Sequence, residues 1–385
     1  MRVVYRRTDD PRVVGGRLTL VGRVNRIVQR RVQARALRGW QTGNPILHSF
    51  GNISAGLVKE LNGCSADILN LHWIAGMLSV ADIGRLTKPI VWTLHDMWAF
   101  CGGEHVTPDF GDARFRRGYL PENRPSGESG PDLNRRTWEA KRAAWAQQHF
   151  TIVCPSRWLA TCAGTSVLFG GRDVHVVPNP LDTEHVWRPM SREAARVSLG
   201  LPPNRLLIQF GAFGGLADKN KGGDLLREAV TRVTARLPCV VELVIFGEAC
   251  PAGGQAWPCP VHWLGDIQDD RMLAMAYSAA DVMVVPSRQE NLPNAAVEAQ
   301  ACGLPVVAFE IGGLPDIITH QETGWLAKAY DTQELAVGIL WVLADRDRGM
   351  VLSRAARQRA VAKFAMPVVA AQYVRVYDRT LRCTV

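Results

Sequence analysis

The stretch from Val284 to Asp316 reads VVPSRQENLPNAAVEAQACGLPVVAFEIGGLPD, and it decides the fold of the chain. The apolar run Val282–Val285 stops at a Pro-Ser pair, as a buried parallel strand does. A polar loop then leads into a predicted helix over Asn294–Cys302. A second apolar strand, Pro305–Phe309, ends at a Gly-Gly turn. The pattern predicts a strand–loop–helix–strand unit of a parallel α/β sheet.

Two glutamates bracket this unit, with Glu290 in the loop and Glu298 inside the helix. The helix N-terminus presents unpaired N–H groups, which suit an anionic group such as phosphate. A carboxylate on the same helix can accept hydrogen bonds from two ribose hydroxyls. The spacing of two glutamates alone could be coincidence. Taken with the loop and the helix, it predicts a site for a nucleoside diphosphate and its sugar.

Residues 290–309, ENLPNAAVEAQACGLPVVAF, resemble the donor-site signature of family 4 glycosyltransferases, which are retaining enzymes of the GT-B fold. The likeness is to bacterial members of the exopolysaccharide and colanic-acid type. It implies an α/β protein with two Rossmann-like domains that face each other across a cleft. It also implies a C-terminal helix that crosses back to the first domain.

Short apolar runs alternate with helical patterns along the chain, which is typical of parallel α/β sheets. The predicted strands are Val3–Tyr5, Asp67–Leu71, Ile90–Leu94, Thr151–Cys154, Val174–Val177, Leu206–Phe210, Val241–Phe246, Val261–Leu264, Val282–Val285, Pro305–Phe309 and Trp325–Ala327. We expect an acceptor domain over residues 1–180 and a donor domain over 181–366, with 367–385 packing back on the first. A linker is predicted at about 180–204.

A second signature lies within residues 66–103, with ADILNLHWIAG at 66–76 and KPIVWTLHDMWAFCGG at 88–103. The strand Ile90–Leu94 would place His95 and Asp96 at its carboxyl end, where α/β sheets bind ligands. A single histidine there is often structural, but the match through residues 93–98 favours a functional role. The resemblance implies that His95 faces the donor sugar, with Asp96 beside it. It leaves the role of His72-Trp73 open, with packing as the default. Relatives carry cysteines and a tyrosine where this chain has residues 104–106, Glu-His-Val, so acceptor recognition there is open.

A third signature, FGAFGGLADKNKGGDLL, covers residues 210–226. Glycines such as Gly211 let a backbone approach a phosphate closely, and Lys221 can neutralise a diphosphate. Many family members carry an arginine directly after the first glycine. This chain has Ala212 there, so Lys221, with Lys219 as the alternative, would carry that charge.

The resemblance also implies a mechanism. Lys221 and the backbone N–H groups near Asn291 and Leu292 would stabilise the departing diphosphate. Glu298 would hold the ribose and Glu290 a hydroxyl of the sugar. Transfer would occur on one face of the sugar without a covalent intermediate, and no metal ion is expected. The Asp-Arg-Asp triplet at 345–347 spells a metal-binding motif of the other glycosyltransferase fold, but it lies at a predicted helix end and is interpreted as solvated charge.

Composition narrows the class of protein. The chain has no run of eighteen apolar residues, so no membrane span is predicted. Its N-terminal segment also lacks the apolar stretch of a secretory signal. Nine cysteines without a CxxC pair favour reduced thiols in the cytoplasm.

The net charge of +9 equals the eleven arginines minus two acids of residues 1–58. A basic amphipathic helix at Arg17–Arg38 could lie on an anionic membrane, which would make the protein peripheral on the inner face of the plasma membrane. An ordinary surface helix is the equal alternative, and nucleic acid is disfavoured because aromatic residues are not interleaved with the arginines.

The segment MRVVYRR resembles the second strand of family members. In those proteins a first strand and a Gly-Gly-Ala loop come before it, so we expect a first βα unit to lie upstream or to be lost. The predicted function is transfer of a hexose from a UDP- or GDP-sugar to a glycan or lipid-linked acceptor in polysaccharide biosynthesis. A non-catalytic donor-site partner protein and a sugar-nucleotide epimerase of the same fold are the alternatives.

Overall fold

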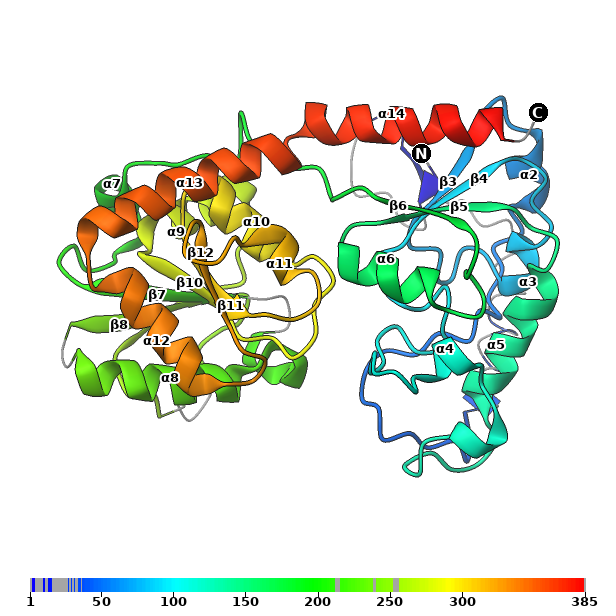
Figure 1. Cartoon of the computed structure of the whole chain (residues 1–385), viewed down its shortest axis with the longest axis horizontal. Coiled ribbons are helices and arrows are strands. Elements are labelled where there is room, and N and C mark those ends of the chain that lie inside the picture. The colour runs from blue at the N-terminus through cyan, green and yellow to red at the C-terminus, as the bar shows by residue number, and fades with distance from the viewer. Residues whose placement is uncertain are drawn as a thin grey trace. The chain divides into compact units, whose positions relative to one another are not determined.

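The computed structural model describes residues 2–3, 10, 13–15, 27, 29, 31, 34–35, 37–211, 215–237, 240–251 and 256–383. Contacts divide the chain into two compact units (Figure 1). Unit 1 is Met1–Val176 with Val374–Val385, and unit 2 is Val177–Tyr373. The sequence placed these divisions at residues 180 and 366.

Unit 2 is built on a six-stranded sheet in which every neighbouring pair is parallel. Its strand order is β12-β11-β10-β7-β8-β9. The strands are β7 (Leu206–Gly211), β8 (Val241–Phe246), β9 (Val261–Gly265), β10 (Val282–Val285), β11 (Val306–Phe309) and β12 (Gly324–Ala327). The order reverses between β7 and β10, and their carboxyl ends open onto the two loops that carry Lys221 and Glu290. Ligands of doubly wound sheets bind at such a position.

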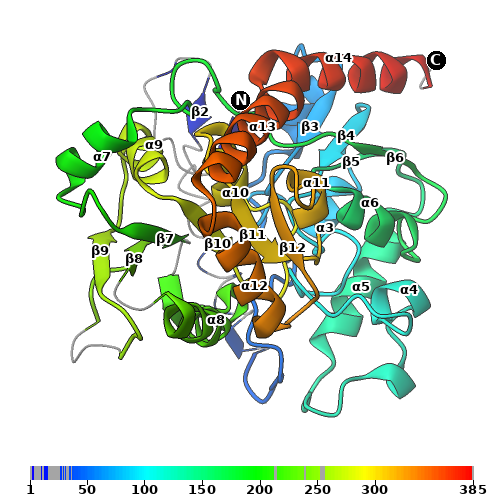
Figure 2. The same ribbon diagram turned by 60° about the vertical axis from the view of Figure 1, so that its left-hand side comes forward.

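Helices cover both faces of this sheet (Figure 2). They are α7 (Arg192–Leu199), α8 (Gly223–Arg236), α9 (Asp270–Ala279), α10 (Asn294–Ala301), α12 (Thr332–Leu343) and α13 (Arg346–Phe364), with the short α11 (Leu314–Ile317). Because side chains alternate along a strand, Leu207 and Val306 join the core of α7, α9, α10 and α13. Ile208 and Val307 join the separate core beneath α8 and α12. The strands are apolar throughout because both of their faces are buried.

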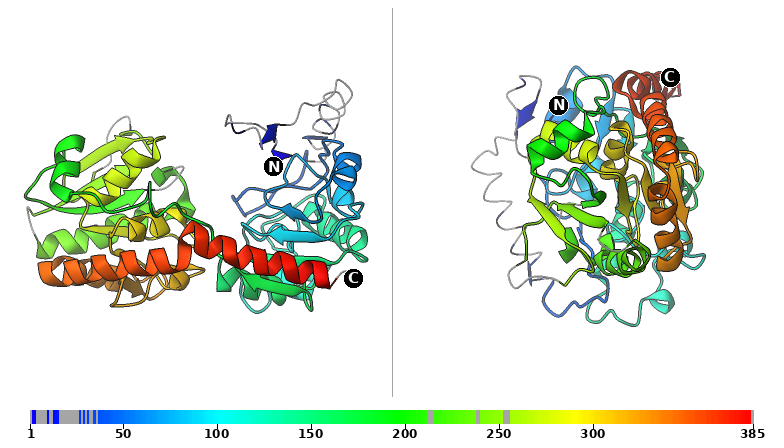
Figure 3. Two further views of the ribbon diagram at one scale, coloured as in Figure 1. Left: turned by 90° about the horizontal axis from the view of Figure 1, so that it is seen from above. Right: turned by 90° about the vertical axis from the view of Figure 1, so that its left-hand side faces the viewer.

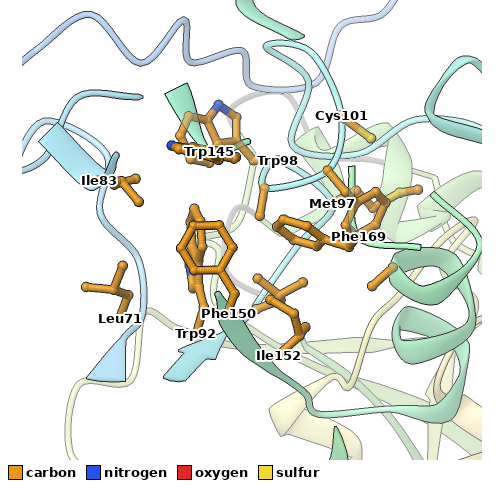
Figure 4. Close-up of a cluster of buried hydrophobic side chains, with 14 of the residues drawn as sticks. Leu71, Ile83, Trp92, Met97, Trp98, Cys101, Trp145, Phe150, Ile152 and Phe169 are labelled. Carbon is orange, nitrogen blue, oxygen red and sulfur yellow. The ribbon is translucent and has the colours of Figure 1, made fainter. Parts of the chain in front are cut away.

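Unit 1 holds a four-stranded parallel sheet in the order β3-β4-β5-β6. Its strands are β3 (Leu69–Leu71), β4 (Ile90–Thr93), β5 (Phe150–Cys154) and β6 (Asp173–Val176). One face packs on α3 (Val80–Ile83), α5 (Leu133–Ala144) and α6 (Arg157–Gly164). Aromatic rings fill this core, as Figure 4 shows: Trp92 meets Trp145 at 5.3 Å and Phe150 at 5.5 Å between ring centroids. The smaller helices of the unit are α2 (Val58–Gly63), α4 (Arg114–Arg117) and the 3₁₀ turn η1 (Pro121–Asn123).

The last helix, α14 (Met366–Arg382), follows α13 after a break at Ala365 (Figure 3). Its final part belongs to unit 1, where polar residues join it to the sheet. Tyr377 accepts a hydrogen bond from Asn70 of β3 at 2.7 Å, and Thr380 bonds Thr151 of β5 at 2.9 Å. Arg379 pairs with Asp173 of β6 at 2.8 Å.

The predicted strand Val3–Tyr5 lies largely outside the described residues, the other predicted strands match the observed ones to within two residues, and the predicted linker differs. The predicted linker at 180–204 contains α7, which is packed against α9 and secured by the buried Arg196, whose guanidinium binds Asp281 at 2.7 Å. The segment therefore belongs to unit 2 and is not a free connection. The N-terminal strand β1 (Arg2–Val3) pairs with β2 (Val14–Gly15) in a sheet of two, apart from the four-stranded sheet.

The basic segment Arg17–Arg38 lies largely outside the described residues, so its amphipathic interpretation stays a prediction. Among the described residues, no helix is long and apolar enough to cross a membrane. The eight cysteines that are described carry no disulfide.

Candidate functional site

Glu290 lies in the loop between β10 and α10, and its carboxylate is bound from two sides. The ammonium of Lys221 lies 2.6 Å from Oε1 of Glu290, and the hydroxyl of Ser287 donates to the same oxygen at 2.9 Å. The Lys221 and Glu290 side chains are 23% and 11% exposed. Both charges therefore reach the surface, where a third group could approach them.

The segment that carries Lys221 is joined to the Glu290 loop through backbone atoms. Lys221 ends the 3₁₀ turn η3 (Lys219–Lys221), directly before α8. The side chain of Asn220 donates to the carbonyl of Gln289 at 2.8 Å, and the amide of Arg288 donates to the carbonyl of Asn220 at 2.7 Å. These bonds fix the position of the ammonium relative to the carboxylate.

Two glycines allow this close approach. Gly222 has φ +71°, and a Cβ there would lie 2.0 Å from the carbonyl oxygen of Pro286. Gly312, with φ +51°, would place a Cβ 1.9 Å from the carbonyl oxygen of Glu290. The amide of Gly313 donates to that same carbonyl at 3.1 Å. Any side chain at these positions would push the loops apart.

Glu298 lies one turn into α10 and is largely buried. The hydroxyl of Tyr277, on α9, donates to its Oε2 at 2.9 Å. Burial raises the pKa of Glu298 to about 7, and the Tyr277 hydrogen bond opposes that shift only in part. This carboxyl therefore changes its protonation state near neutral pH.

The start of α10 and the end of β7 add backbone groups to the site. Pro293 is the N-cap residue of α10 and makes no side-chain cap, so the first turn depends on other acceptors for its N–H groups. The side chain of Leu292 is buried in the core, which leaves its backbone as the part that could meet a ligand. Gly211 ends β7, and a Cβ there would lie 2.1 Å from the ring of Phe246. Packing against Phe246 is thus a second reason for a glycine at that position.

In unit 1 the strand end of β4 brings His95 next to His72. Nδ1 of His72 lies 2.9 Å from Nε2 of His95, and the rings stack with centroids 5.2 Å apart. Both histidines are exposed at the surface, and the surrounding protein still removes part of their hydration. Desolvation, followed by the neighbouring His95, lowers the pKa of His72 to about 4, and desolvation also lowers that of His95. Both rings are therefore neutral at pH 7, and their bond gives them complementary tautomers.

Asp96 points to a different partner, His105, which the sequence analysis did not propose as a functional residue. Oδ2 of Asp96 lies 2.7 Å from Nδ1 of His105, whose Nε2 lies 2.8 Å from the hydroxyl of Ser49. Oδ1 of Asp96 accepts from the amide of Trp98 at 2.8 Å. Both carboxylate oxygens are thus used to hold neighbouring groups. Trp73 was predicted by default to be a packing residue. One face of its indole does pack, on His105, but 49% of the residue remains exposed.

A buried lysine supports the loop that follows Asp96. Lys141 on α5 is fully buried and donates to the carbonyls of Trp98, Cys101 (3.0 Å) and Gly102 (2.7 Å). Its Nζ lies 3.7 Å from the centroid of a Trp98 ring. Burial lowers the pKa of Lys141 to about 7. The sequence of its helix, DLNRRTWEAKRAAW, is amphipathic, and Lys141 falls on the apolar face. That position could have identified Lys141 as a buried lysine from the sequence.

The metal-binding triplet noted in the sequence has a structural role, and so does another potential metal ligand, His262. Asp345, the first residue of the Asp-Arg-Asp triplet, caps α13 by accepting from the amides of Asp347 and Arg348. His262, three residues after a cysteine, lies 2.6 Å from Glu242. Within the part of the chain that the structure describes, no group of three or more His, Cys, Asp or Glu residues is arranged to hold a metal ion.

Comparison with known proteins agrees with this architecture. Residues 208–345, most of unit 2, match the family model described as Glycosyl transferases group 1. The D-inositol 3-phosphate glycosyltransferase of Segniliparus rotundus is 29% identical over 343 residues, which are 86% of this chain and 70% of that protein. The protein of the same name from Mycobacterium bovis (strain BCG / Pasteur 1173P2) is 38% identical over 190 residues, or 46% of this chain and 38% of that protein.

Solved structures share the fold at low sequence identity. The glycosyltransferase of Rickettsia africae aligns with a TM-score of 0.62 at 15% identity, over 86% of this chain and 81% of that one. Anabaena Alr3699/HepE in complex with UDP aligns with a TM-score of 0.60 at 18% identity, over 84% and 81%. The two parallel-sheet units have the α/β architecture of GT-B glycosyltransferases, and residues 208–345 are similar to the group 1 glycosyl transferases.

Proposed function

We propose that the chain transfers a sugar from a nucleoside-diphosphate donor to a hydroxyl of a glycan or lipid-linked acceptor, in polysaccharide biosynthesis and with retention of the anomeric configuration. The observation that carries this proposal is the Lys221–Glu290 pair beside α10, the helix that bears Glu298. An ammonium, a helix start and two carboxylates are the groups that a diphosphate, a ribose and a hexose require.

Each residue has a distinct role in the proposed reaction. Lys221 and the N–H groups near Asn291 and Leu292 stabilise the negative charge that develops on the diphosphate as its bond to the anomeric carbon breaks. Glu298 accepts from the ribose hydroxyls, and Glu290 accepts from a hydroxyl of the sugar. The acceptor oxygen forms the new bond on the face that the diphosphate leaves, and its proton passes to the departing phosphate oxygen. Because Lys221 supplies the positive charge, the proposed reaction uses no metal ion.

His95 and Asp96 of unit 1 serve this reaction in different ways. We assign His95 to a hydroxyl of the donor sugar, as a neutral imidazole whose ring is held by His72. Asp96 acts through His105, because its two oxygens hold that ring and the amide of Trp98.

The comparisons suggest which substrates to test first. Anabaena Alr3699/HepE has been solved with UDP and with UDP-glucose, so a uridine nucleotide is the first donor to examine. Several relatives are named D-inositol 3-phosphate glycosyltransferase, so a phosphorylated polyol is a second acceptor class beside glycans. Most of these alignments cover less than half of the relative's length.

Thermal unfolding in the presence of UDP or GDP tests the donor site. A nucleotide that binds the folded protein raises the unfolding temperature by mass action. We expect protection by one of the two, its loss in Glu298→Ala, and its retention in Glu322→Ala, which removes an exposed glutamate of the same unit. Folded protein that neither nucleotide protects would overturn the proposed donor site. NMR of the product's anomeric proton then distinguishes retention from inversion.

A further inference from the structure

An exposed tryptophan lies beside the histidine pair of unit 1. Trp73 follows β3 and His72 in the chain and leaves 49% of its surface exposed. Its indole stacks on the imidazole of His105, with ring centroids 4.6 Å apart and an angle of 21° between the planes. One face of the indole is therefore covered by protein, while much of the side chain remains in contact with solvent.

The ring beneath Trp73 is held rigidly. His105 is buried, and both of its nitrogens are engaged, Nδ1 by Asp96 and Nε2 by Ser49. Asp96 is itself fixed by the amide of Trp98. A large flat surface that is fixed before a ligand arrives loses little conformational entropy on binding.

Polar groups stand beside this surface and line one open pocket together with it. Its lining includes Trp73, the neutral imidazoles of His72 and His95, and Asp96. A flat apolar face flanked by a few fixed hydrogen-bonding groups suits a ring that is apolar on its faces and hydroxylated at its rim. A pyranose has this chemistry, because its C–H bonds point to its faces and its hydroxyls point outward.

We propose that Trp73 is a platform on which a pyranose ring of the acceptor stacks, with the ring's hydroxyls directed toward His72. This assignment rests on the proposed glycosyltransferase reaction and names the substrate class on the unit 1 side of it. Trp73 contributes the contact area, whereas Ser49, Asp96 and His105 position it.

The order Ser49–His105–Asp96 is also that of a hydrolase triad, in which histidine activates the serine oxygen. Such a site needs backbone N–H groups directed at the developing oxyanion. The amide of Ser49 instead donates to the carbonyl of Gly103 at 2.7 Å. The three side chains therefore act as a brace for Trp73.

Saturation-transfer NMR on the full chain tests the platform with methyl α-glucopyranoside, methyl α-mannopyranoside and methyl β-galactopyranoside as probes. We expect at least one probe to bind wild type in the millimolar range. Trp73→Ala should weaken that binding about tenfold, while Trp73→Phe, which keeps an aromatic face, should lose about threefold or less. Phe110→Ala is the matched control, because Phe110 is an aromatic of the same unit, 70% exposed and outside the pocket lining.

Equal binding by wild type and Trp73→Ala would overturn the proposal, as would wild type that binds none of the three probes. UDP and GDP protection, measured on the same samples, separates this result from the proposed function. Trp73 belongs to unit 1 and Glu298 to unit 2, so Trp73→Ala should keep the nucleotide protection of wild type. Probe binding that depends on Trp73 without nucleotide protection would sustain the platform and overturn the donor site. The reverse pattern would sustain the donor site and overturn the platform.

Discussion

Nζ of Lys221 lies 2.6 Å from Oε1 of Glu290, although 69 positions separate the two residues in the chain. Ser287 binds the same carboxylate oxygen, and backbone bonds from Asn220 and Arg288 hold the two loops together. Without a substrate the ammonium is neutralised by the carboxylate. A diphosphate would add a second negative partner for Lys221, whose charge then acts on the leaving group while Glu290 turns to a sugar hydroxyl.

Removing this ammonium should impair the chemical step more than the fold. We expect Lys221→Ala to lower kcat about a hundredfold or more, the size of effect seen when one donor to a developing oxyanion is lost. The free energy of unfolding should change by less than about 1 kcal/mol, because a partly exposed ion pair contributes little to stability. Rates of nucleotide release with an active acceptor and urea denaturation measure the two effects.

Two lysines serve as comparisons for this prediction. Lys219→Ala removes the neighbouring exposed lysine of η3, and Lys328→Ala removes an exposed lysine elsewhere in unit 2. A large loss in Lys219→Ala with normal activity in Lys221→Ala would show that Lys219 carries the charge.

Gly312 should tolerate no side chain. Gly312→Ala would force a Cβ to within 1.9 Å of the carbonyl of Glu290 at a positive φ, so the loop that carries Glu290 must move. We expect a loss of about 3 kcal/mol in the free energy of unfolding and loss of nucleotide protection. Gly200→Ala provides the control, because Gly200 has a similar φ of +65° and open space around its Cβ position. Its cost should be about 1 kcal/mol, with nucleotide protection retained. Equal costs for the two variants would mean that backbone conformation alone requires Gly312.

The sequence predicted the strands well because a strand buried on both faces has a distinctive form. The runs at Val241–Phe246 and Val282–Val285 are short, apolar and ended by Gly or Pro, and both were located at their observed bounds. The contacts of Glu290 could not be predicted in the same way. The sequence places Lys221 after one predicted strand and Glu290 after another, but only the structure shows that these strands are neighbours and that the two irregular loops touch.

The side chains that support Trp73 could not be predicted from sequence patterns. Asp96 and His105 lie in the irregular loop that follows β4, and Ser49 lies in an earlier loop, so no periodic spacing connects the three residues. Lys141 was hidden for a different reason. A lysine on a helix is expected to face solvent, and only the three carbonyls directed at it show why it can be buried.

Lys141 should therefore be a stability residue of unit 1. Lys141→Met fills a similar volume but leaves the carbonyls of Trp98, Cys101 and Gly102 without their donor, and we expect a loss of about 3 kcal/mol. Chemical denaturation measures it. Arg136→Met, at an exposed position of the same helix, should change stability by less than about 0.5 kcal/mol. A stable Lys141→Met protein with unchanged acceptor binding would show that the loop carrying Trp98, Cys101 and Gly102 keeps its conformation without the lysine.

Glu298 should make both stability and nucleotide binding depend on pH, in opposite directions. Its pKa rises from 4.5 to about 7 in the folded protein. The folded state therefore binds more protons than the unfolded chain between these values, and the stabilisation that is present below pH 4.5 is lost as pH rises through about 7. The shift of 7 − 4.5 = 2.5 units corresponds to about 3 kcal/mol at most. Relative to Glu298→Gln, wild type without ligand should become less stable over this range.

Nucleotide binding should strengthen over the same range, because the ionised carboxylate is the better acceptor for two ribose hydroxyls. Titration calorimetry of wild type between about pH 5.5 and pH 8.5 should show the affinity rising through pH 7. The phosphate of the nucleotide also titrates near pH 6, and Glu298→Gln carries that contribution alone. The difference between the two proteins therefore belongs to Glu298. Identical pH profiles would mean that Glu298 does not touch the ribose, and the acceptor of those hydroxyls would have to be sought elsewhere in unit 2.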